Sequence, residues 1–330
     1  MKENKQDKYS NPFRATLTGI QALFKKAEPA GSLGPEDRLD GKTVLVDGAS
    51  SGLGFAVAVD VARRGAKVIM ACRSGIPDKG EEVKKRSGSM DVHMLHVDFS
   101  ETASIYNLVR EIKEKFSPVD ILVCNAGIVP KQSRKTKEGI EEMFMVNYFS
   151  KFIFVNLLIG QQCFNRLGNA IPRLIFVASE SHRNPAQFEW DSFGIYKEYT
   201  IGKSVSLYGY YKLLLTTYTV ELSRRLNKGG KTDFSVFALC PGPVNSNIAR
   251  EAPGLFQPLL RLVFSIFFRS PEKAAIPVIY LAASKDEEGK PFDYLFLMGR
   301  KEVDEKAKDP RYGDLLWKLS EELQKKLTSI

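Results

Sequence analysis

The chain has 330 residues, 43% of them hydrophobic and 26% charged, with a formal net charge of +9. This is the composition of an ordinary soluble globular protein that can build a sizeable core. The lysines and arginines are spread along the chain, which argues against nucleic-acid binding and fits a phosphate-bearing cofactor or an anionic membrane surface.

Residues 1–40 are predicted to form an N-terminal extension. Apolar residues from Phe13 to Phe24 recur at the spacing of one helical face, and residues 27–41, rich in glycine, proline and acid, predict a linker. The helix has two alternative interpretations. It either docks on the domain or on a partner subunit, or it lies on a membrane surface through residues 13–26.

A strand, a glycine-rich turn and a helix are predicted from Lys42 to Arg64. The run from Thr43 to Val46 is aliphatic and β-branched, and the glycines that follow have the spacing G-x-x-x-G-x-G. This arrangement aims a helix N-terminus at a phosphate, although a tight turn without a ligand is the alternative. The predicted cofactor-binding residues of the turn are Gly48, Ser50, Ser51, Gly52, Leu53 and Gly54.

A second strand is predicted from Lys67 to Ala71, and Arg73 follows it. In this architecture the end of the second strand meets the adenosine ribose of a dinucleotide. A carboxylate there favours NAD, whereas an arginine suits the 2′-phosphate of NADP. Because Arg73 is present and no carboxylate accompanies it, NADP is predicted rather than NAD. A solvated loop arginine is the alternative.

Strands and helices alternate up to residue 298. Further strands are expected at 92–97, 119–123, 173–178, 234–239 and 292–298, and helices at 105–116, 141–162, 207–226, 271–283 and 315–327. Ser100 and Ser206 are the expected N-caps of two of these helices. Because βαβ units wind right-handed, we predict an α/β fold: a single Rossmann-type doubly wound parallel sheet with helices on both faces. It spans residues 41–300, and residues 301–330 form a helical tail packed on it.

Ligands bind beyond the carboxyl ends of the strands in such a sheet. The candidate residues that follow predicted strands are Gly48, Arg73, Asp98, Asn125, Ser179 and Pro241-Gly242. They predict one site at this edge.

Tyr208 and Lys212 are four residues apart on a predicted helix, so they face the same side. A phenol is a poor base at neutral pH, but an ammonium one turn away stabilises the phenolate. Ser179, at the end of the neighbouring strand, can hold a carbonyl or hydroxyl oxygen beside the phenol. The Tyr–Lys spacing is common by chance, and its position after the Ser179 strand makes it specific to hydride chemistry.

Taken together, these motifs resemble the short-chain dehydrogenase/reductase family over roughly residues 40–300. The resemblance rests on the glycine turn, Asp98, Asn125-Ala126-Gly127, Asn147, Ser179, Tyr208-x-x-x-Lys212 and Pro241-Gly242. It implies that Tyr208 is the general acid/base, and that Lys212 binds the nicotinamide ribose and lowers the tyrosine pKa. It also implies that Ser179 orients the substrate oxygen.

The resemblance assigns the remaining residues as well. Asn147 supports a water in the proton relay, with a structural amide as the alternative, and Asp98 contacts the adenine. The turn of Asn125, Ala126 and Gly127 places the cofactor against the central strand. The residues from Pro241 to Ser246 cover the nicotinamide, with contacts from Pro241, Gly242, Val244 and Ser246.

Within the family, the chain is most similar to the retinol-dehydrogenase-like branch. The shared features are Met70-Ala-Cys-Arg73, Ser179-x-x-His182, the 29-residue Ser–Tyr separation, Phe267–Pro271 and Leu316-Trp317. Some motifs also resemble light-dependent protochlorophyllide reductases. The resemblance implies an NADP(H)-dependent oxidoreductase that acts on the carbonyl or alcohol of an apolar, lipid- or retinoid-like substrate. Homodimers and homotetramers are common in the family.

Two features keep alternatives open. Asp47 stands where the family usually has threonine and places a negative charge near the pyrophosphate, which favours a cofactor-binding scaffold or sensor with little turnover. The apolar residues 255–268 either line the substrate pocket as a helix hairpin or contact a membrane peripherally.

Cysteine and histidine spacing predicts neither disulfides nor a metal site. The four cysteines, Cys72, Cys124, Cys163 and Cys240, contain no C-x-x-C pair, and three of them lie in apolar strand-like runs. We expect reduced thiols, no secretory signal, no bilayer-spanning helix and a cytoplasmic location.

Overall fold

The computed structural model describes residues 29–244 and 269–328. These residues form an eight-stranded sheet with the order β3-β2-β1-β4-β5-β6-β7-β8. Neighbouring strands are parallel except β8, which is antiparallel to β7. The chain steps outward from β1 first in one direction and then in the other, which makes the sheet doubly wound. The predicted fold class is confirmed, with an antiparallel edge strand added.

The strands are short and largely buried, because helices cover both faces of the sheet. Their bounds are β1 Thr43–Asp47, β2 Lys67–Cys72, β3 Val92–His96, β4 Ile121–Cys124, β5 Arg173–Val177, β6 Ser235–Cys240, β7 Phe292–Phe296 and β8 Gly299–Arg300.

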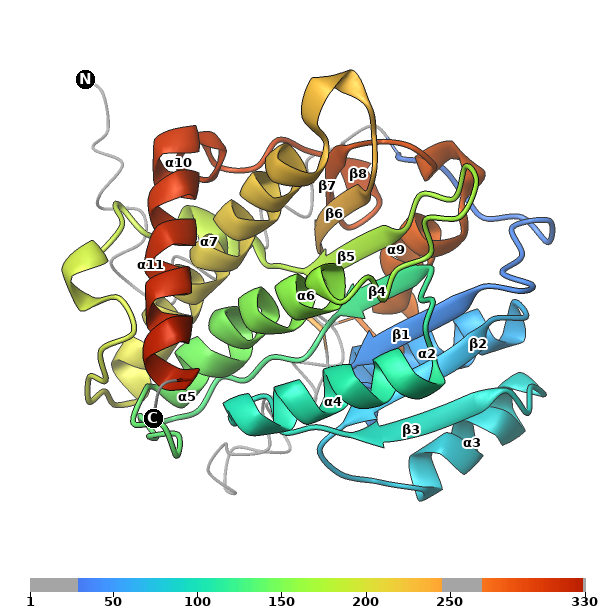
Figure 1. Ribbon diagram of the computed structural model, residues 1–330, viewed down its shortest axis with the longest axis horizontal. Coiled ribbons are helices and arrows are strands. Elements are labelled where there is room, and N and C mark those ends of the chain that lie inside the picture. Colours follow the sequence, from blue (N-terminus) through green and yellow to red (C-terminus); the bar gives the residue numbers. More distant parts are fainter. Residues whose placement is uncertain (1–28, 245–268, 329–330) are drawn as a thin grey trace.

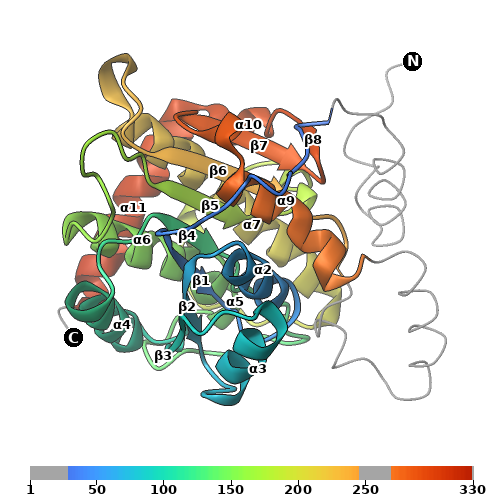
Figure 2. The ribbon, with the colours of Figure 1, turned by 90° about the vertical axis from the view of Figure 1, so that its right-hand side faces the viewer.

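Two groups of helices cover the two faces (Figure 1 and Figure 2). One face carries α2 Gly52–Arg63, α3 Asp78–Ser87 and α9 Pro271–Ala283. The other carries α4 Thr102–Lys115, α5 Glu142–Phe144, the π-helix Met145–Phe149, α6 Ser150–Gly160 and α7 Ile201–Leu226. Short 3-10 helices lie at Glu180–Arg183, Trp190–Ser192, Lys228–Gly230 and Lys285–Glu287.

The C-terminal helices α10 Glu305–Lys308 and α11 Pro310–Thr328 pack on α7 (Figure 1). Leu316 is buried in this contact, and the Tyr148 hydroxyl lies 2.5 Å from Ser320 Oγ. The tail therefore supports the helix that carries Tyr208.

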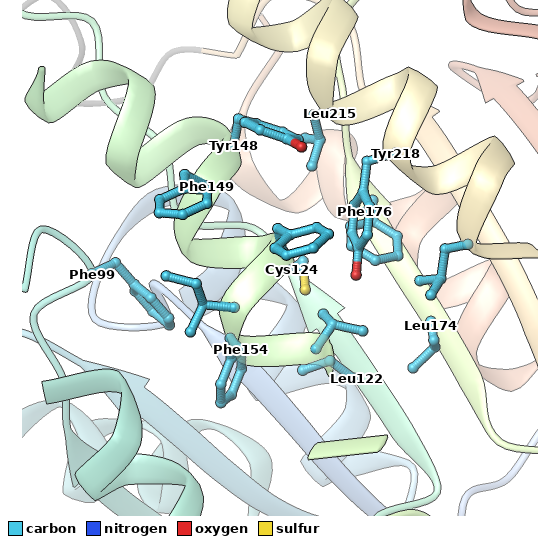
Figure 3. Packing of buried hydrophobic residues seen from close by; sticks show 14 of the residues in the cluster. Phe99, Leu122, Cys124, Tyr148, Phe149, Phe154, Leu174, Phe176, Leu215 and Tyr218 are labelled. Carbon is cyan, nitrogen blue, oxygen red and sulfur yellow. The ribbon is translucent and has the colours of Figure 1, made fainter. Parts of the chain in front are cut away.

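Aromatic side chains fill the space between the sheet and the helices α6 and α7 (Figure 3). Phe154, Phe176 and Tyr218 are at most 1% exposed there, and Phe176 and Tyr218 pack edge to face. Cys124 lies among them, and all four cysteines are buried and free. This packing holds β4 and β5, the strands that precede Asn125 and Ser179, in fixed positions.

Two predicted N-caps are wrong. Helix α7 begins at Ile201 rather than near Leu207, so Ser206 lies inside it; Ser204 instead anchors this early turn by donating to the Pro130 carbonyl at 2.5 Å. Helix α4 begins at Thr102, after Glu101. The Ser100 side chain turns back to the loop after β3, where its hydroxyl donates to Asp98 Oδ1 at 2.7 Å.

The expected continuous helix over 141–162 is interrupted by the π-helix Met145–Phe149, which contains Asn147. The sequence analysis also missed α3 and β8. In α3 only Gly80 and Val83 are buried, so it lacks the apolar stripe by which a helix is recognised, and β8 has two residues.

Candidate active site

The glycine turn after β1 packs tightly against Asn125. Gly48 and Gly52 have φ of 61° and 57°, values that side chains rarely tolerate. A Cβ atom on Gly54 would lie 2.5 Å from Asn125 Nδ2 and 2.6 Å from the Gly48 carbonyl. Asn125 Nδ2 donates to the carbonyls of Asp47 and Gly48 at 3.1 and 3.2 Å. The turn thus needs glycine for close backbone approach.

The N-terminus of α2 opens toward a surface hollow of about 440 Å³. Ser51 is the N-cap residue of α2, but its side chain makes no hydrogen bond to the helix. The first turn of α2 carries no acidic residue. The backbone N–H groups there are consequently suited to an anion. The hollow is lined by Ser50, Ser51, Gly52, Phe55, Ala56, Ser74, Gly75, Lys79, Glu82, Arg86, Pro271 and Glu272.

Arg73 and Asp98, predicted at the ribose and the adenine, lie beside each other. Arg73 is 65% exposed, and its Nη1 is 3.9 Å from Asp98 Oδ2. Asp98 Oδ1 also accepts from the Ser100 N–H at 2.9 Å. Two further cations, Lys79 and Arg86, stand near the Phe55 ring at 5.4 and 5.3 Å from its centroid. Both cations also face carboxylates: Lys79 pairs with Glu82 at 2.6 Å, and Arg86 lies 3.5 Å from Glu272. Paired charges of both signs therefore line the hollow beside the end of β2.

Asp47 is fully buried beneath the glycine turn. Its Oδ1 accepts hydrogen bonds from the backbone N–H groups of Asn125, at 2.6 Å, and of Ala126. Its Oδ2 accepts from Lys151 Nζ at 2.8 Å, and Lys151 is 1% exposed. The negative charge is thus compensated by a buried lysine.

Ser179, Tyr208 and Lys212 converge where β5 ends beside α7. The Ser179 side chain is one of the groups that act on the pKa of the Tyr208 phenol. Ser179 Oγ itself accepts from the Ser181 hydroxyl at 2.9 Å and from the Ser181 N–H at 3.2 Å. Lys212 Nζ lies 5.6 Å from the centroid of the Tyr208 ring and donates to the Val177 carbonyl at 2.7 Å. This is the arrangement that the four-residue spacing predicts.

Asn147 projects from the π-helix onto the backbone of Ile128. Its Oδ1 accepts from the Ile128 N–H and its Nδ2 donates to the Ile128 carbonyl, both at 2.8 Å. A Cβ on Gly127 would lie 2.7 Å from Asn147 Oδ1 and 3.8 Å from Lys212 Nζ. Asn147 therefore fixes the turn that approaches the lysine.

Burial controls protonation in this group. It raises the pKa of Tyr208 above its ordinary value, a rise that the Cys240 thiol increases and the hydrogen bond to Ser179 opposes. Burial, followed by the charge of Lys151, lowers the pKa of Lys212 to about 8. The expected lowering of the Tyr208 pKa by Lys212 is not seen in the chain alone, since burial dominates. At neutral pH the phenol is protonated and most Lys212 is charged.

Pro241 and Gly242 follow β6 at the same edge of the sheet. Gly242 has φ of 80°, and a Cβ there would lie 2.7 Å from Leu297 Cδ2. Val244 pairs with Arg269, whose N–H donates to the Pro243 carbonyl at 2.8 Å. Within the described chain, Arg269 Nη1 is buried without a hydrogen-bond partner. Ser246 and residues 13–26 and 255–268 lie outside the described residues.

Comparison with known proteins identifies the family of the chain. A family model described as short chain dehydrogenase matches residues 42–189. Human retinol dehydrogenase 14 is 32% identical over 300 residues, covering 86% of each chain, and human retinol dehydrogenase 13 is 30% identical over 311 residues, covering 92% of this chain and 90% of its own. The chain belongs to the short-chain dehydrogenase family, in its retinol-dehydrogenase-like branch.

Solved structures show the same fold. An uncharacterized protein from Mycobacterium paratuberculosis superposes with a TM-score of 0.66 at 27% identity, covering 91% of this chain and 98% of that one. The Pseudomonas aeruginosa RhlG/NADP active-site complex superposes with a TM-score of 0.60 at 21% identity, covering 81% and 98%. This short-chain dehydrogenase is therefore an oxidoreductase with a nucleotide-binding Rossmann-type fold and a small alcohol or carbonyl substrate.

The sequence analysis missed several charged groups of the site. Lys79 and Arg86 lie on α3, a helix that was not predicted. Lys151 lies inside an apolar helix and Arg269 after an apolar run, where a single cation looks like a solvated side chain. Asp47, directly after the predicted strand, signals that a buried cation is needed, although it does not indicate which one.

The helical stretch Glu142–Gly160 is long and apolar enough to cross a membrane, and it is the one such stretch among the described residues. Since 78% of it is buried inside the domain, it is a core helix. In the described ranges no three His, Cys, Asp or Glu side chains are grouped to hold a metal ion.

Proposed function

We propose that this short-chain dehydrogenase is an NADP(H)-dependent oxidoreductase, with Tyr208 as the general acid/base. The observation that carries the proposal is the position of the buried Lys212 ammonium, 5.6 Å from the centroid of the Tyr208 ring and bonded to the Val177 carbonyl, two residues before Ser179. The protonated phenol donates its proton to the carbonyl oxygen during reduction. In the reverse reaction the phenolate takes a proton from the alcohol. Ser179 holds that oxygen by a hydrogen bond.

Lys212 supports Tyr208 through its charge. The ammonium stabilises the phenolate that remains after proton transfer. Its bond to the Val177 carbonyl fixes its position and leaves two N–H donors for a ribose. Asn147, through the Ile128 backbone, keeps this part of the site in place and supports a water in the proton relay.

The residues present fit a phosphorylated dinucleotide. The glycine turn leaves no room for a Cβ, and the first turn of α2 carries no acidic residue. Among the residues that the structure describes, none accepts a hydrogen bond from the buried Arg269 Nη1. When bound, NADP(H) supplies or accepts the hydride. Arg73 binds the 2′-phosphate in this proposal, with Ser50, Ser74 and Lys79 at the hollow.

An apolar substrate is the proposed class. Ile201 and Val205, which are 62% and 50% exposed, lie on α7 at the helical spacing that leads to Tyr208. Exposed aliphatic groups on the helix that carries the phenol favour a lipid-like aldehyde, ketone or alcohol over a sugar. The relatives named retinol dehydrogenases make retinal and retinol the first compounds to test.

The test is a spectrophotometric assay with NADPH and NADH and a panel of aldehydes, ketones and, in reverse, alcohols. The proposal predicts turnover with NADPH on apolar carbonyls. Cofactor binding without turnover on the whole panel would favour a scaffold or sensor. The feature that favoured that alternative, Asp47, is compensated by Lys151.

A cytoplasmic location with peripheral membrane contact is part of the proposal, through residues 13–26 or 255–268. Co-sedimentation with anionic liposomes, compared between the full chain and a variant lacking residues 1–28, tests the first segment. Sedimentation velocity tests the proposed homodimer or homotetramer.

A further inference from the structure

The two charges of the Asp47–Lys151 pair come from two elements that are far apart in the sequence. Asp47 is the last residue of β1, before the glycine turn, and Lys151 lies in the first turn of α6, four residues after Asn147. Their 2.8 Å contact is sealed from solvent, with exposed fractions of 0% and 1%. Removing one partner of a buried ion pair is strongly destabilising, because it leaves an uncompensated charge inside the protein.

The carboxylate does more than neutralise the lysine. Its other oxygen accepts from the N–H groups of Asn125 and Ala126, the turn after β4. Asn125 in turn bonds back to the Asp47 and Gly48 carbonyls. One buried side chain thereby joins the turns that follow β1 and β4, and those two turns form the proposed cofactor edge.

Lys151 has no other described acceptor to replace this carboxylate. Its Nζ lies 3.9 Å from the centroid of the Phe99 ring, a cation–π contact that offers no hydrogen-bond acceptor and no counter-charge. Phe99 directly follows Asp98, the proposed adenine contact. Loss of the carboxylate would therefore leave the ammonium inside the core beside this loop.

We propose that Asp47 and Lys151 act as one positioning pair, which holds the Asn125–Ala126 turn against the glycine turn and ties both to the helix that follows Asn147. The inference rests on the proposed function, because the edge it organises is the proposed cofactor site. Neither side chain is a catalytic residue, since both are covered by the turns.

The test is a double-mutant cycle read by NADPH fluorescence titration, thermal unfolding and steady-state kinetics. Asp47→Thr keeps a hydroxyl that can accept from the Asn125–Ala126 turn, but it leaves the Lys151 ammonium unpaired. Lys151→Met leaves the Asp47 carboxylate unpaired beneath the proposed site of the NADPH phosphates. Each single variant should weaken NADPH binding by at least about tenfold and raise KM for NADPH more than it lowers kcat. The double variant D47T/K151M carries no charge at either position, and its Kd for NADPH should return to within about threefold of the parent value.

Arg300→Met is the matched control. Arg300 Nη2 lies 2.5 Å from the buried Glu287, in an ion pair at the β8 edge of the sheet. This variant should lower Tm while leaving the Kd of NADPH unchanged. Unchanged Kd in both single variants, or a double variant as weak as the worse single, would overturn the proposal.

The cycle remains decisive in two further cases. If the single variants fail to fold, recovery of folding in D47T/K151M or in D47N/K151M supports the pair, and failure of both doubles contradicts it. If the parent chain binds no NADPH, the proposed function fails, but Tm still measures the coupling between the two residues. If each single variant lowers Tm and the double variant does not restore it, Asp47 and Lys151 act independently and the proposed pair is contradicted.

Discussion

The His182 ring ties the backbone of Ser179 to the C-terminal segment. Its Nδ1 lies 2.6 Å from the Ser179 carbonyl and its Nε2 accepts the Asp304 N–H at 3.2 Å. Both ring nitrogens are thus used by a neutral imidazole whose Nδ1–H donates to the carbonyl. The ring is fully buried, and burial is the main cause that lowers the pKa of His182 to about 4.

This contact predicts a loss of stability in acid. Between pH 6.5 and about 4 the unfolded chain takes up a proton at residue 182, whereas the folded chain does not. The free energy of unfolding should therefore fall by about 3 kcal/mol over this window as the pH decreases. Urea unfolding at a series of pH values measures it.

His182→Gln should remove this contribution to the pH dependence while lowering stability at pH 7. His93, which is half-buried and pairs with Asp91, is the control, and His93→Gln should leave the slope intact. An unchanged slope in His182→Gln would show that the imidazole is not the group responsible.

Substitution of Gly54 is expected to lower the affinity for the cofactor. Alanine there would place its Cβ 2.6 Å from the Gly48 carbonyl, a backbone atom that cannot swing away. Gly54→Ala should weaken NADPH binding by about tenfold or more, since the turn must open. Isothermal titration measures the effect.

Gly202→Ala is the matched control, because a Cβ at this helical position meets nothing within 4 Å. It should keep the parent Kd and gain about 0.5–1 kcal/mol of stability. Equal affinities in the two variants would contradict the tight-turn explanation.

Arg73 is expected to determine the preference for NADPH over NADH. Replacing it by methionine should lower kcat/KM with NADPH about 10- to 100-fold and leave the value with NADH nearly unchanged, because a charge-assisted bond to the 2′-phosphate is lost. Arg63, at the exposed end of α2, is the control. A parallel loss with both cofactors would assign Arg73 to the structure of the loop instead.

The strands, the glycine turn and the Tyr208–Lys212 pair were predictable because each is recorded in local residue order. The Asp47–Lys151 contact was not, since its partners are 104 residues apart and a lone lysine in an apolar helix has no local signature. The π-helix at Asn147 is an insertion in backbone hydrogen bonding that leaves no mark in composition. The early start of α7 depends on Ser204 reaching Pro130, which is again a tertiary contact.

The account depends most on proton transfer at Tyr208, and a single-turnover measurement tests it directly. Parent, Tyr208→Phe and Tyr210→Phe enzymes are saturated with NADPH and mixed with an aldehyde that the parent reduces. Tyr210, on the same helix, accepts the Glu189 N–H and serves as the control. The account predicts that the rate falls by roughly 10²–10⁴-fold in Tyr208→Phe only, with the Kd of NADPH nearly unchanged. A Tyr208→Phe rate close to that of the parent would contradict it.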